Sequence, residues 1–248
     1  MGSYADDALF MSRNNIEYVE LISDDGKSKV MVIPAWQGRV MTTSAAGDEG
    51  DSYGWINYSF IKKRQIDLQF NPVGGEERFW LGPEGGVFSL YFRQGEKQIY
   101  KNWKVPPVLD IEAFKIQSQS KNCICLTKEG CLTNACGTTF YLNIKRTISL
   151  LDINEFAASF NLEFPKDIKA VAYKSDNQIT NIGNESWNKE TGLISVWMLS
   201  MFNPTSATTV FIPYKQSRKG KIVNDEYFGK IPTDRPVSYT HLRAHETR

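Results

Sequence analysis

The hydrophobic pattern of this chain has a period of two, and this period constrains the fold more than any other feature. Along most of the sequence, β-branched and aromatic residues occupy alternate positions, and turn-forming residues separate the runs. Such alternation turns one face of a strand toward a core and the other toward solvent. We therefore expect an all-β chain of antiparallel strands, at Ile16–Ser23, Lys29–Pro34, Arg39–Ser44, Gly54–Phe60, Val87–Arg93, Phe114–Ser120, Cys123–Lys128, Thr138–Leu151, Ile168–Tyr173, Asn177–Ile182, Gly192–Phe202 and Thr208–Pro213.

The sequence also predicts one or two short helices and several tight turns. One helix is expected at Tyr4–Arg13. A second is expected at Asp152–Phe160, where Asp152 can cap the helix and Glu155 stands three residues on, the spacing of a capping box. Residues that tolerate hairpin geometry mark three turns, at Asp24-Asp25-Gly26, Lys128-Glu129-Gly130 and Ile182-Gly183-Asn184.

The end of the chain, residues 238–248, differs in character from the rest. It is similar to translated sequencing adapter at the ends of metagenomic reading frames, so we exclude it from the fold analysis. Both histidines, His241 and His245, lie in it, and its two arginines and one glutamate carry a net +1, so the formal charge of the remainder falls from +1 to zero. The 248-residue chain is 41% hydrophobic, enough for a substantial core, and we expect one domain over residues 1–237.

Charge and motifs exclude several classes of function. The basic residues are scattered, which leaves no electrostatic footprint for a nucleic acid. No apolar run is long enough to span a bilayer, so we expect a soluble protein without membrane insertion, cytoplasmic or periplasmic; a lost signal peptide would favour the periplasm. No dinucleotide or phosphate-loop motif is present, and no cofactor is implied. Because residues 1–237 contain no histidine, Ser-His-Asp and Cys-His catalytic arrangements are excluded there.

A short run at residues 71–86 combines glycines, carboxylates, an arginine and a tryptophan. Its glycines permit positive φ angles and close approach, and Trp80 offers a flat apolar face. Arg78, Glu76 and Glu84 add planar hydrogen-bonding groups. A sugar presents apolar C–H groups and a rim of hydroxyls, so this irregular run predicts a carbohydrate site rather than a phosphate site. The alternative is a solvated glycine-rich turn with a core tryptophan.

Further motifs accompany this run in a fixed order. They are PAWQGRV at 34–40, GWIN at 54–57, GGEERFWLGPEGG at 74–86, NQITNIG at 177–183, KETGLISVW at 189–197 and VNDEYFGKIP at 223–232. Together they resemble an uncharacterised bacterial family, of the Bacteroidetes type, with a galactose-mutarotase-like fold. The resemblance implies an antiparallel two-sheet supersandwich whose concave face binds a sugar. It also implies a chain that is incomplete at its C-terminus, because family members continue beyond the position of Pro236.

The resemblance implies no particular reaction. Aldose epimerases of that superfamily use a carboxylate base and a histidine acid, and residues 1–237 contain no histidine. We therefore expect a protein that recognises a mono- or oligosaccharide on the concave sheet face. Two alternatives stay open: a sugar-processing enzyme, an epimerase-like isomerase or a carbohydrate hydrolase, with part of its site in the missing portion; and a structural protein without a sugar site. The oligomeric state also stays open.

Individual residues can be assigned to this expected site. Glu76 and Glu84 are the candidate catalytic carboxylates, which in glycosidic chemistry would stand about 5 to 9.5 Å apart; binding of sugar hydroxyls, or a salt bridge, is the alternative. Asn57 is expected to share a strand face with Trp55, and Trp197 is expected in the core. The candidate ligand-binding residues, each weighed against a structural role, are Arg78, Trp80, Arg39, Trp36, Asn57 and Trp103.

Four cysteines fall within one short stretch, at Cys123, Cys125, Cys131 and Cys136. Their spacing does not fit a zinc knuckle, which needs two close pairs, so no metal site is predicted. A disulfide across the turn expected at 128–130 is one alternative, and it would favour an extracytoplasmic setting. Buried or incidental thiols are the other.

Overall fold

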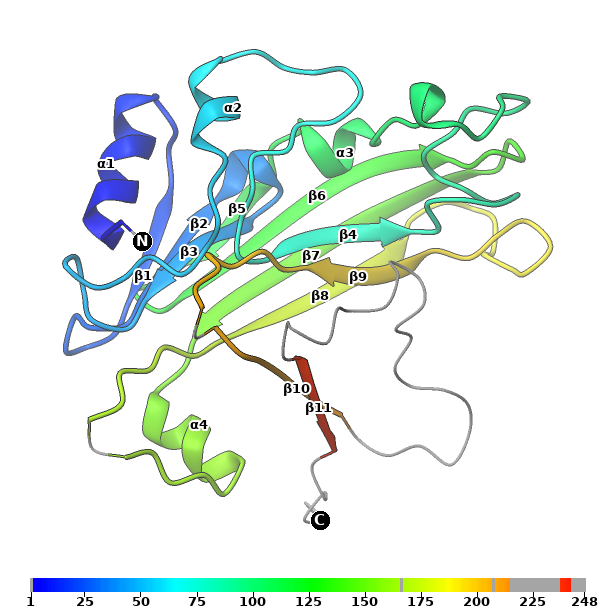
Figure 1. The fold of residues 1–248 in the computed structure, drawn as a ribbon. Coiled ribbons are helices and arrows are strands. Elements are labelled where there is room, and N and C mark those ends of the chain that lie inside the picture. The colour runs from blue at the N-terminus through cyan, green and yellow to red at the C-terminus, as the bar shows by residue number, and fades with distance from the viewer. Residues whose placement is uncertain (1, 166, 207, 215–236, 242–248) are drawn as a thin grey trace. The chain divides into compact units, whose positions relative to one another are not determined.

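The computed structural model describes residues 2–165, 167–206, 208–214 and 237–241 (Figure 1). The chain forms two compact units, Met1–Asn203 and Pro204–Arg248. The first unit contains three antiparallel sheets, in the orders β1-β2-β3, β4-β9 and β5-β6-β7-β8. In the second, β10 (Val210–Tyr214) pairs in parallel with β11 (Val237–His241). The helices are few and short, so the predicted all-β, sandwich-like class is confirmed.

The largest sheet has one apolar face and one polar face. Its strands are β5 (Lys115–Gln119), β6 (Cys123–Thr133), β7 (Thr139–Leu150) and β8 (Tyr173–Asn181), all antiparallel to their neighbours. Along β7 every even-numbered residue is buried and every odd-numbered residue is at least partly exposed. The alternation follows from the pleat, and it places one face of the sheet in the core.

A second sheet is covered on both faces. It consists of β1 (Val19–Ile22), β2 (Lys29–Ile33) and β3 (Arg39–Ser44). Alternate residues of β2 enter different cores: Val30 and Val32 pack in the main core, and Met31 and Ile33 pack in a smaller one. Every residue of β2 and β3 is therefore buried, which is the burial expected of a strand covered on both sides.

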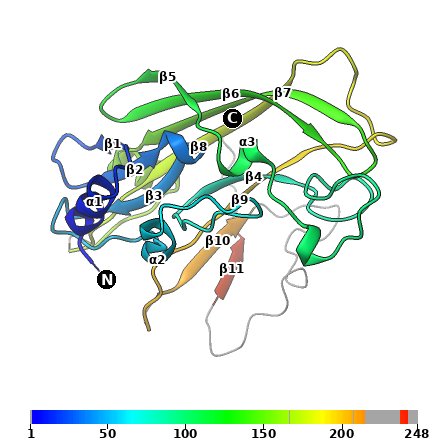
Figure 2. The ribbon, with the colours of Figure 1, turned by 90° about the horizontal axis from the view of Figure 1, so that it is seen from above.

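Helices and a strand pair complete the first unit. The smaller core takes Tyr4 and Met11 from α1 (Tyr4–Arg13), and the main core takes Phe79 and Leu81 from β4 (Arg78–Gly82). Figure 2 shows β6 and β7 as a layer across from β3 and β4. The other elements are α2 (Tyr58–Lys62), α3 (Pro107–Asp110), α4 (Ile153–Ser159), β9 (Ser195–Leu199) and two 3₁₀ turns, Pro34–Trp36 and Tyr100–Asn102.

A buried ion pair ties the layers together. The guanidinium of Arg146 on β7 donates to the Glu77 carboxylate at 2.8 Å and to the Gly38 carbonyl at 3.2 Å. The same carboxylate accepts from the Ser175 hydroxyl at 2.7 Å, and Asn177 accepts from Arg146 at 2.8 Å. The Arg146 side chain is fully buried. Its hydrogen bonds are therefore shielded from solvent, and hydrogen bonds are electrostatically stronger in the protein interior than in water.

Several sequence predictions of secondary structure are confirmed. Helix α1 has the predicted bounds, and the Asp152 side chain caps α4 by accepting from the Asn154 and Glu155 N–H groups. The turn at Asp24-Asp25-Gly26 joins β1 to β2. The strand predicted at Thr208–Pro213 corresponds to β10, two residues later at its start.

Other predictions are wrong. Gly54–Phe60 is no strand, because Gly54 and Ile56 form only isolated bridges and Asn57 then caps α2. Val87–Arg93 forms bends and turns. In the predicted strand Ile168–Tyr173, only the last residue is in a strand, because β8 begins at Tyr173. Lys128-Glu129-Gly130 is no turn, since all three residues pair with β7 inside β6. The hairpin turns later, where the Asn134 side chain accepts from the N–H groups of Cys136 and Thr138.

The predicted limits of the domain lie partly outside the described residues. Part of the predicted tail, residues 238–241, belongs to β11, and residues 242–248 are not described. The motif at 223–232 also lies outside the described residues. A single domain over 1–237 stays a prediction. None of the described helices has the length and apolar character needed to cross a membrane.

The buried ion pair can be tested with a pair of variants. Arg146→Met leaves the Glu77 carboxylate buried without its cation, and we expect it to lower the free energy of unfolding by roughly 3 to 5 kcal/mol. Adding Glu77→Gln removes the stranded charge and should recover most of that loss. Urea unfolding at one pH measures both. A double variant as unstable as the single one would contradict this role of the pair.

Candidate functional site

The glycine-rich run is not an open loop but the approach to a buried strand. Its residues 78–82 form β4, and the exposed fractions of Glu76, Arg78 and Trp80 are 3%, 1% and 3%. The expectation of an irregular run is therefore wrong for residues 78–82, which form a strand, and the carbohydrate site expected there stays a prediction. The polar residues of this run are held in the interior because each finds a protein partner there, as buried polar groups require.

Trp80 is a core residue. Its ring stacks on Tyr91 at 5.4 Å between centroids and meets Trp197 edge-on at 6.0 Å, so Trp197 does lie against the core as predicted. Its indole N–H donates to the Glu84 carboxylate at 2.5 Å. Neither the ring of Trp80 nor its N–H is open to a sugar, and Glu84 is engaged by this bond.

The two predicted arginines are also interior. Arg78 forms a salt bridge with Asp110 at 2.9 Å and lies over the Trp80 ring, 4.0 Å from its centroid. Arg39 donates to the Gly74 carbonyl at 2.6 Å and forms no salt bridge with any described residue. Burial lowers the pKa of Arg39 well below its usual value. Gly75 has a φ of +117°, and a Cβ there would lie 2.5 Å from the Arg39 side chain, so only glycine leaves room for it.

Glu76 is a buried carboxyl that forms no salt bridge with any residue the structure describes. Thr43 donates to both of its oxygens, at 3.1 and 2.9 Å, and the Tyr173 hydroxyl also hydrogen-bonds to it. Burial raises the pKa of Glu76 to about 7, and these hydrogen bonds oppose the rise. Glu76 thus contacts β3 and β8, whereas Glu84 contacts Trp80, and no described contact joins the two carboxylates into a pair.

The remaining predicted residues serve the fold at three separate places. Trp36 ends a 3₁₀ turn and packs on the smaller core. Asn57 accepts from the Phe60 N–H at 3.1 Å as the cap of α2, so the shared strand face with Trp55 is wrong. Trp103 stacks between Tyr91 and Tyr100, with centroids 5.5 and 6.2 Å away. The structure brings Arg78, Trp80 and Glu84 into contact around a buried ring, whereas Trp36, Asn57 and Trp103 contact other residues.

All four cysteines are free thiols. Cys123 and Cys125 lie on β6, and the residues of the expected turn lie within that strand, so the disulfide considered there does not form. Among the described residues, no group of three or more His, Cys, Asp or Glu side chains is placed to hold a metal.

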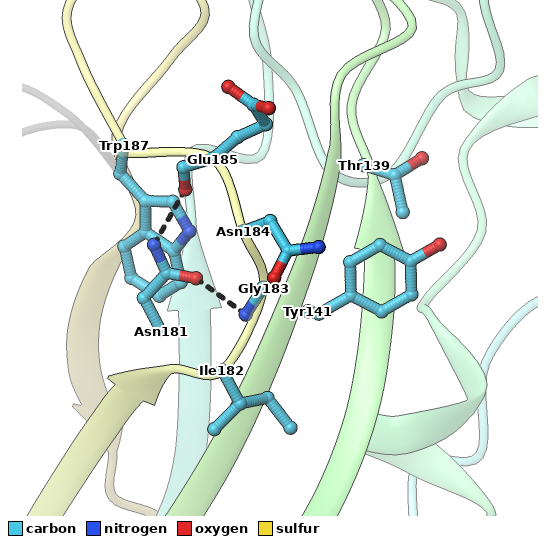
Figure 3. Close-up of a pocket in the computed structure, with 8 residues that line it drawn as sticks. All are labelled: Thr139, Tyr141, Asn181, Ile182, Gly183, Asn184, Glu185 and Trp187. Atoms are coloured by element: carbon cyan, nitrogen blue, oxygen red, sulfur yellow. Dashed lines mark hydrogen bonds between the residues drawn. The ribbon is translucent and has the colours of Figure 1, made fainter.

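A hollow at the end of β7 and β8 gathers the side chains suited to a polar ligand. Its volume is about 370 Å³ (Figure 3). Residues from the start of β7, from the last position of β8 and from the segment after β8 line it: Thr139, Tyr141, Asn181, Ile182, Gly183, Asn184, Glu185 and Trp187. Thr139 and Tyr141 stand two apart on β7 and so share its outer face. The Tyr141 side chain is on the polar side of the sheet and is 55% exposed.

Local hydrogen bonds shape this hollow. Asn181, the last residue of β8, accepts from the Gly183 N–H at 2.9 Å and donates to the Glu185 carbonyl at 2.8 Å. The Ile182 N–H donates to the Tyr141 carbonyl at 3.0 Å, which holds the turn against β7. Gly183 lies beside the tyrosine ring, where a Cβ would sit 3.3 Å from it. The turn is therefore fixed by its own bonds, and the ring keeps an open face.

Trp187 closes the far side of the turn. Its ring meets the buried Phe140 edge-on at 5.6 Å. Figure 3 shows Trp187 and Tyr141 on opposite sides of the turn, with the Asn184 amide directed toward Tyr141 and the Glu185 carboxylate projecting outward. The Asn184 amide, the Glu185 carboxylate and the Tyr141 hydroxyl have no hydrogen-bond partner among the described residues. These three groups remain available to a ligand.

The sequence carried a signal for this site. Residues 181–187, NIGNESW, place amides, a carboxylate and a tryptophan around a glycine, the same mixture that drew attention to residues 71–86. What could not be read from the sequence is that Tyr141 on β7 faces this segment, because that depends on the pairing of Leu142 with Asn181.

The raised pKa of Glu76 can be tested through the pH dependence of the free energy of unfolding. A folded-state pKa of about 7, against 4.5 for an ordinary glutamate, means that the folded chain holds this proton more tightly than the unfolded chain. The stability linked to Glu76 is therefore complete below pH 4.5 and is lost as the pH rises toward 7. Relative to Glu76→Gln, we expect the wild-type free energy of unfolding to fall by on the order of 3 kcal/mol between pH 4.5 and 8.

Denaturant unfolding across that pH range measures the difference. The matched control is Glu129→Gln, because Glu129 is an exposed residue of the same type on β6. Parallel pH profiles for wild type and Glu76→Gln would contradict the raised pKa.

Comparison with known proteins assigns the chain to a family. No curated protein and no solved structure matches it. Residues 2–242 match a family described as a family of unknown function, DUF6786. This match covers nearly the whole chain, and the chain therefore belongs to the DUF6786 family.

Proposed function

We propose that this protein binds a neutral carbohydrate in the hollow between the end of β7 and the turn after β8. The observation that carries the proposal is the exposed Tyr141 ring, toward which the unpartnered Asn184 amide is directed, with the unpartnered Glu185 carboxylate on the same turn. An aromatic face takes the C–H groups of a sugar, and the amide and carboxylate take its hydroxyls. The volume, about 370 Å³, lies in the range of small-ligand pockets, roughly 300 to 1,000 Å³.

The charge of the lining supports a neutral ligand. The described residues that line the hollow include no lysine or arginine, and Glu185 brings one negative charge. A phosphate, a nucleotide or another anion would meet no cation there, and anion sites are built from basic side chains or from exposed backbone N–H groups. A polyol gains hydrogen bonds without needing a counter-charge.

The same lining supports binding without turnover. Glycosidic and ring-opening reactions use two positioned groups that transfer protons, and among the described residues that line the hollow Glu185 is the one carboxylate. Glu76 has a pKa suited to proton transfer, but it is buried and does not line the hollow. A sugar-processing enzyme is thus the second candidate, and the titration of Glu76 is what favours it.

The proposal extends to the wider class of the protein. We infer a bacterial carbohydrate-binding protein of the galactose-mutarotase-like supersandwich type, in a periplasmic or cytoplasmic setting. Two packed layers of antiparallel strands support the supersandwich, as do the ordered motifs at 34–40, 54–57 and 74–86.

Substitution of Tyr141 tests the sugar site. We expect Tyr141→Ala to weaken saccharide binding at least about tenfold, which is about 1.4 kcal/mol of lost stacking, and Tyr141→Phe to retain most of it. The matched control is Tyr100→Ala, since Tyr100 is a tyrosine 75% exposed at another place on the same unit. A panel of mono- and oligosaccharides titrated by calorimetry gives the affinities.

The same panel separates the candidates. Failure of every saccharide would reject the proposal and favour a structural protein, and equal loss with Tyr100→Ala would place the sugar elsewhere. Chemical change of a bound sugar, abolished by Glu76→Gln with binding retained, would favour the enzyme.

A further inference from the structure

A second hollow differs in character from the one beside Tyr141, because its floor is apolar and its rim is basic. Its volume is about 480 Å³. Three segments form it, residues 90–94, 102–107 and 131–134, together with Leu68. It shares no lining residue with the hollow beside Tyr141, and nothing in the proposed carbohydrate site uses it.

Backbone hydrogen bonds hold the three segments in place. The Lys104 N–H donates to the Tyr91 carbonyl at 2.9 Å, and the Val105 N–H donates to the Gln69 carbonyl at 2.9 Å. The Ala135 N–H donates to the Ser89 carbonyl at 2.8 Å, which fixes the β6–β7 hairpin against the first segment. The walls are thus formed before any ligand arrives, and a preformed site loses little freedom on binding.

The floor of this hollow belongs to the main core. Five of its lining residues are core members with exposed fractions of 2% to 9%: Leu90, Tyr91, Phe92, Val105 and Leu132. Pro106 and Pro107 extend the apolar wall, and Leu68 stands at its edge with 83% of its side chain exposed. The apolar part of a ligand that bound here would be transferred from water onto this apolar floor.

The rim of the hollow carries positive charge alone. Arg93 and Lys104 line it, and its described lining residues include no aspartate or glutamate. Both side chains are exposed, and neither has a salt bridge or hydrogen bond to any residue that the structure describes. Glu96 lies nearby in the chain, but it accepts from the Arg93 backbone N–H at 3.4 Å and is not part of the lining. The two cations are free to meet an anion.

We propose that this hollow binds a small amphiphilic carboxylate, with its apolar body on the core floor and its carboxylate between Arg93 and Lys104. The apolar floor selects against a sugar or inorganic phosphate, which would lose hydration there without compensation. The basic rim selects an anion over a neutral molecule of the same shape, and a carboxylate accepts well from both guanidinium and ammonium groups.

An exposed thiol reports on occupancy. Cys131 lines the hollow, whereas Cys136, farther along the same hairpin, is also exposed and does not line it. Alkylation by the neutral reagent iodoacetamide, followed by peptide mass spectrometry, gives the rate at each thiol in the same molecule. A ligand in the hollow should slow the reaction of Cys131 and leave Cys136 as an internal control.

The experiment uses the full chain with octanoate as the probe and octanamide as its uncharged counterpart. We expect octanoate to slow alkylation of Cys131 at least about fivefold in a saturable way, with no change at Cys136. Octanamide should need a concentration at least about tenfold higher for the same effect. No slowing of Cys131 by octanoate, equal slowing of both thiols, or equal potency of octanamide would overturn the proposal.

Substitutions then test whether Arg93 and Lys104 are the cations that bind the carboxylate. Arg93→Gln with Lys104→Gln should raise the half-protecting octanoate concentration at least about tenfold. The matched control, Lys97→Gln with Lys101→Gln, changes two exposed cations that do not line the hollow and should leave that concentration unchanged. An equal loss in the control pair would show attraction to the general basic surface and would overturn the assignment, and the comparison of octanoate with octanamide stands even without any variant.

Discussion

The structure depends on the buried pair of Arg146 and Glu77. A buried charge without a counter-charge or hydrogen bonds is costly, and the segment that carries Glu77 lies where the Arg146 guanidinium reaches it at 2.8 Å. That pairing fixes the start of β4 against β7. It also fixes the turn before β3, because Arg146 donates to the Gly38 carbonyl. One fully buried side chain thus sets the spacing of all three sheets of the first unit, and the core fills the space that it defines.

The success and failure of the sequence analysis follow from the range of the interactions involved. The alternation along β7 and the helix at Tyr4–Arg13 depend on local pattern, and both were predictable. The deep burial of Glu76, Arg78 and Trp80 could not be predicted from residues 71–86 alone, because it depends on the partners of these side chains. Those partners, Thr43, Asp110 and Tyr91 among them, come from other parts of the chain, and no local pattern identifies them. The turn expected at 128–130 failed for the same reason, because long-range pairing overrode the preference of its glycine.

The candidate site shows the same division between composition and position. A combination of an aromatic ring with polar side chains was expected at residues 71–86, but Glu76, Arg78 and Trp80 are buried there. In the structure such a combination stands at residues 181–187, opposite Tyr141. The second hollow could not be found from the sequence, since Arg93, Lys104 and Cys131 come from three segments that only the backbone bonds of the fold bring together. The core supplies the floor of the hollow lined by Arg93 and Lys104. It also supports the turn of the hollow beside Tyr141, where Trp187 packs on Phe140.

The aromatic rings around Trp80 have an optical consequence. Trp80, Tyr91, Trp103 and Tyr100 stack one on the next, with interplanar angles of 26°, 6° and 14°, from the interior to the surface. Fixed rings at such spacing in a chiral setting couple their electronic transitions, so the folded chain should show an intense near-ultraviolet circular dichroism. The outermost ring is exposed to solvent while the innermost is packed between sheets. Disorder anywhere along this stack should therefore weaken the near-ultraviolet signal.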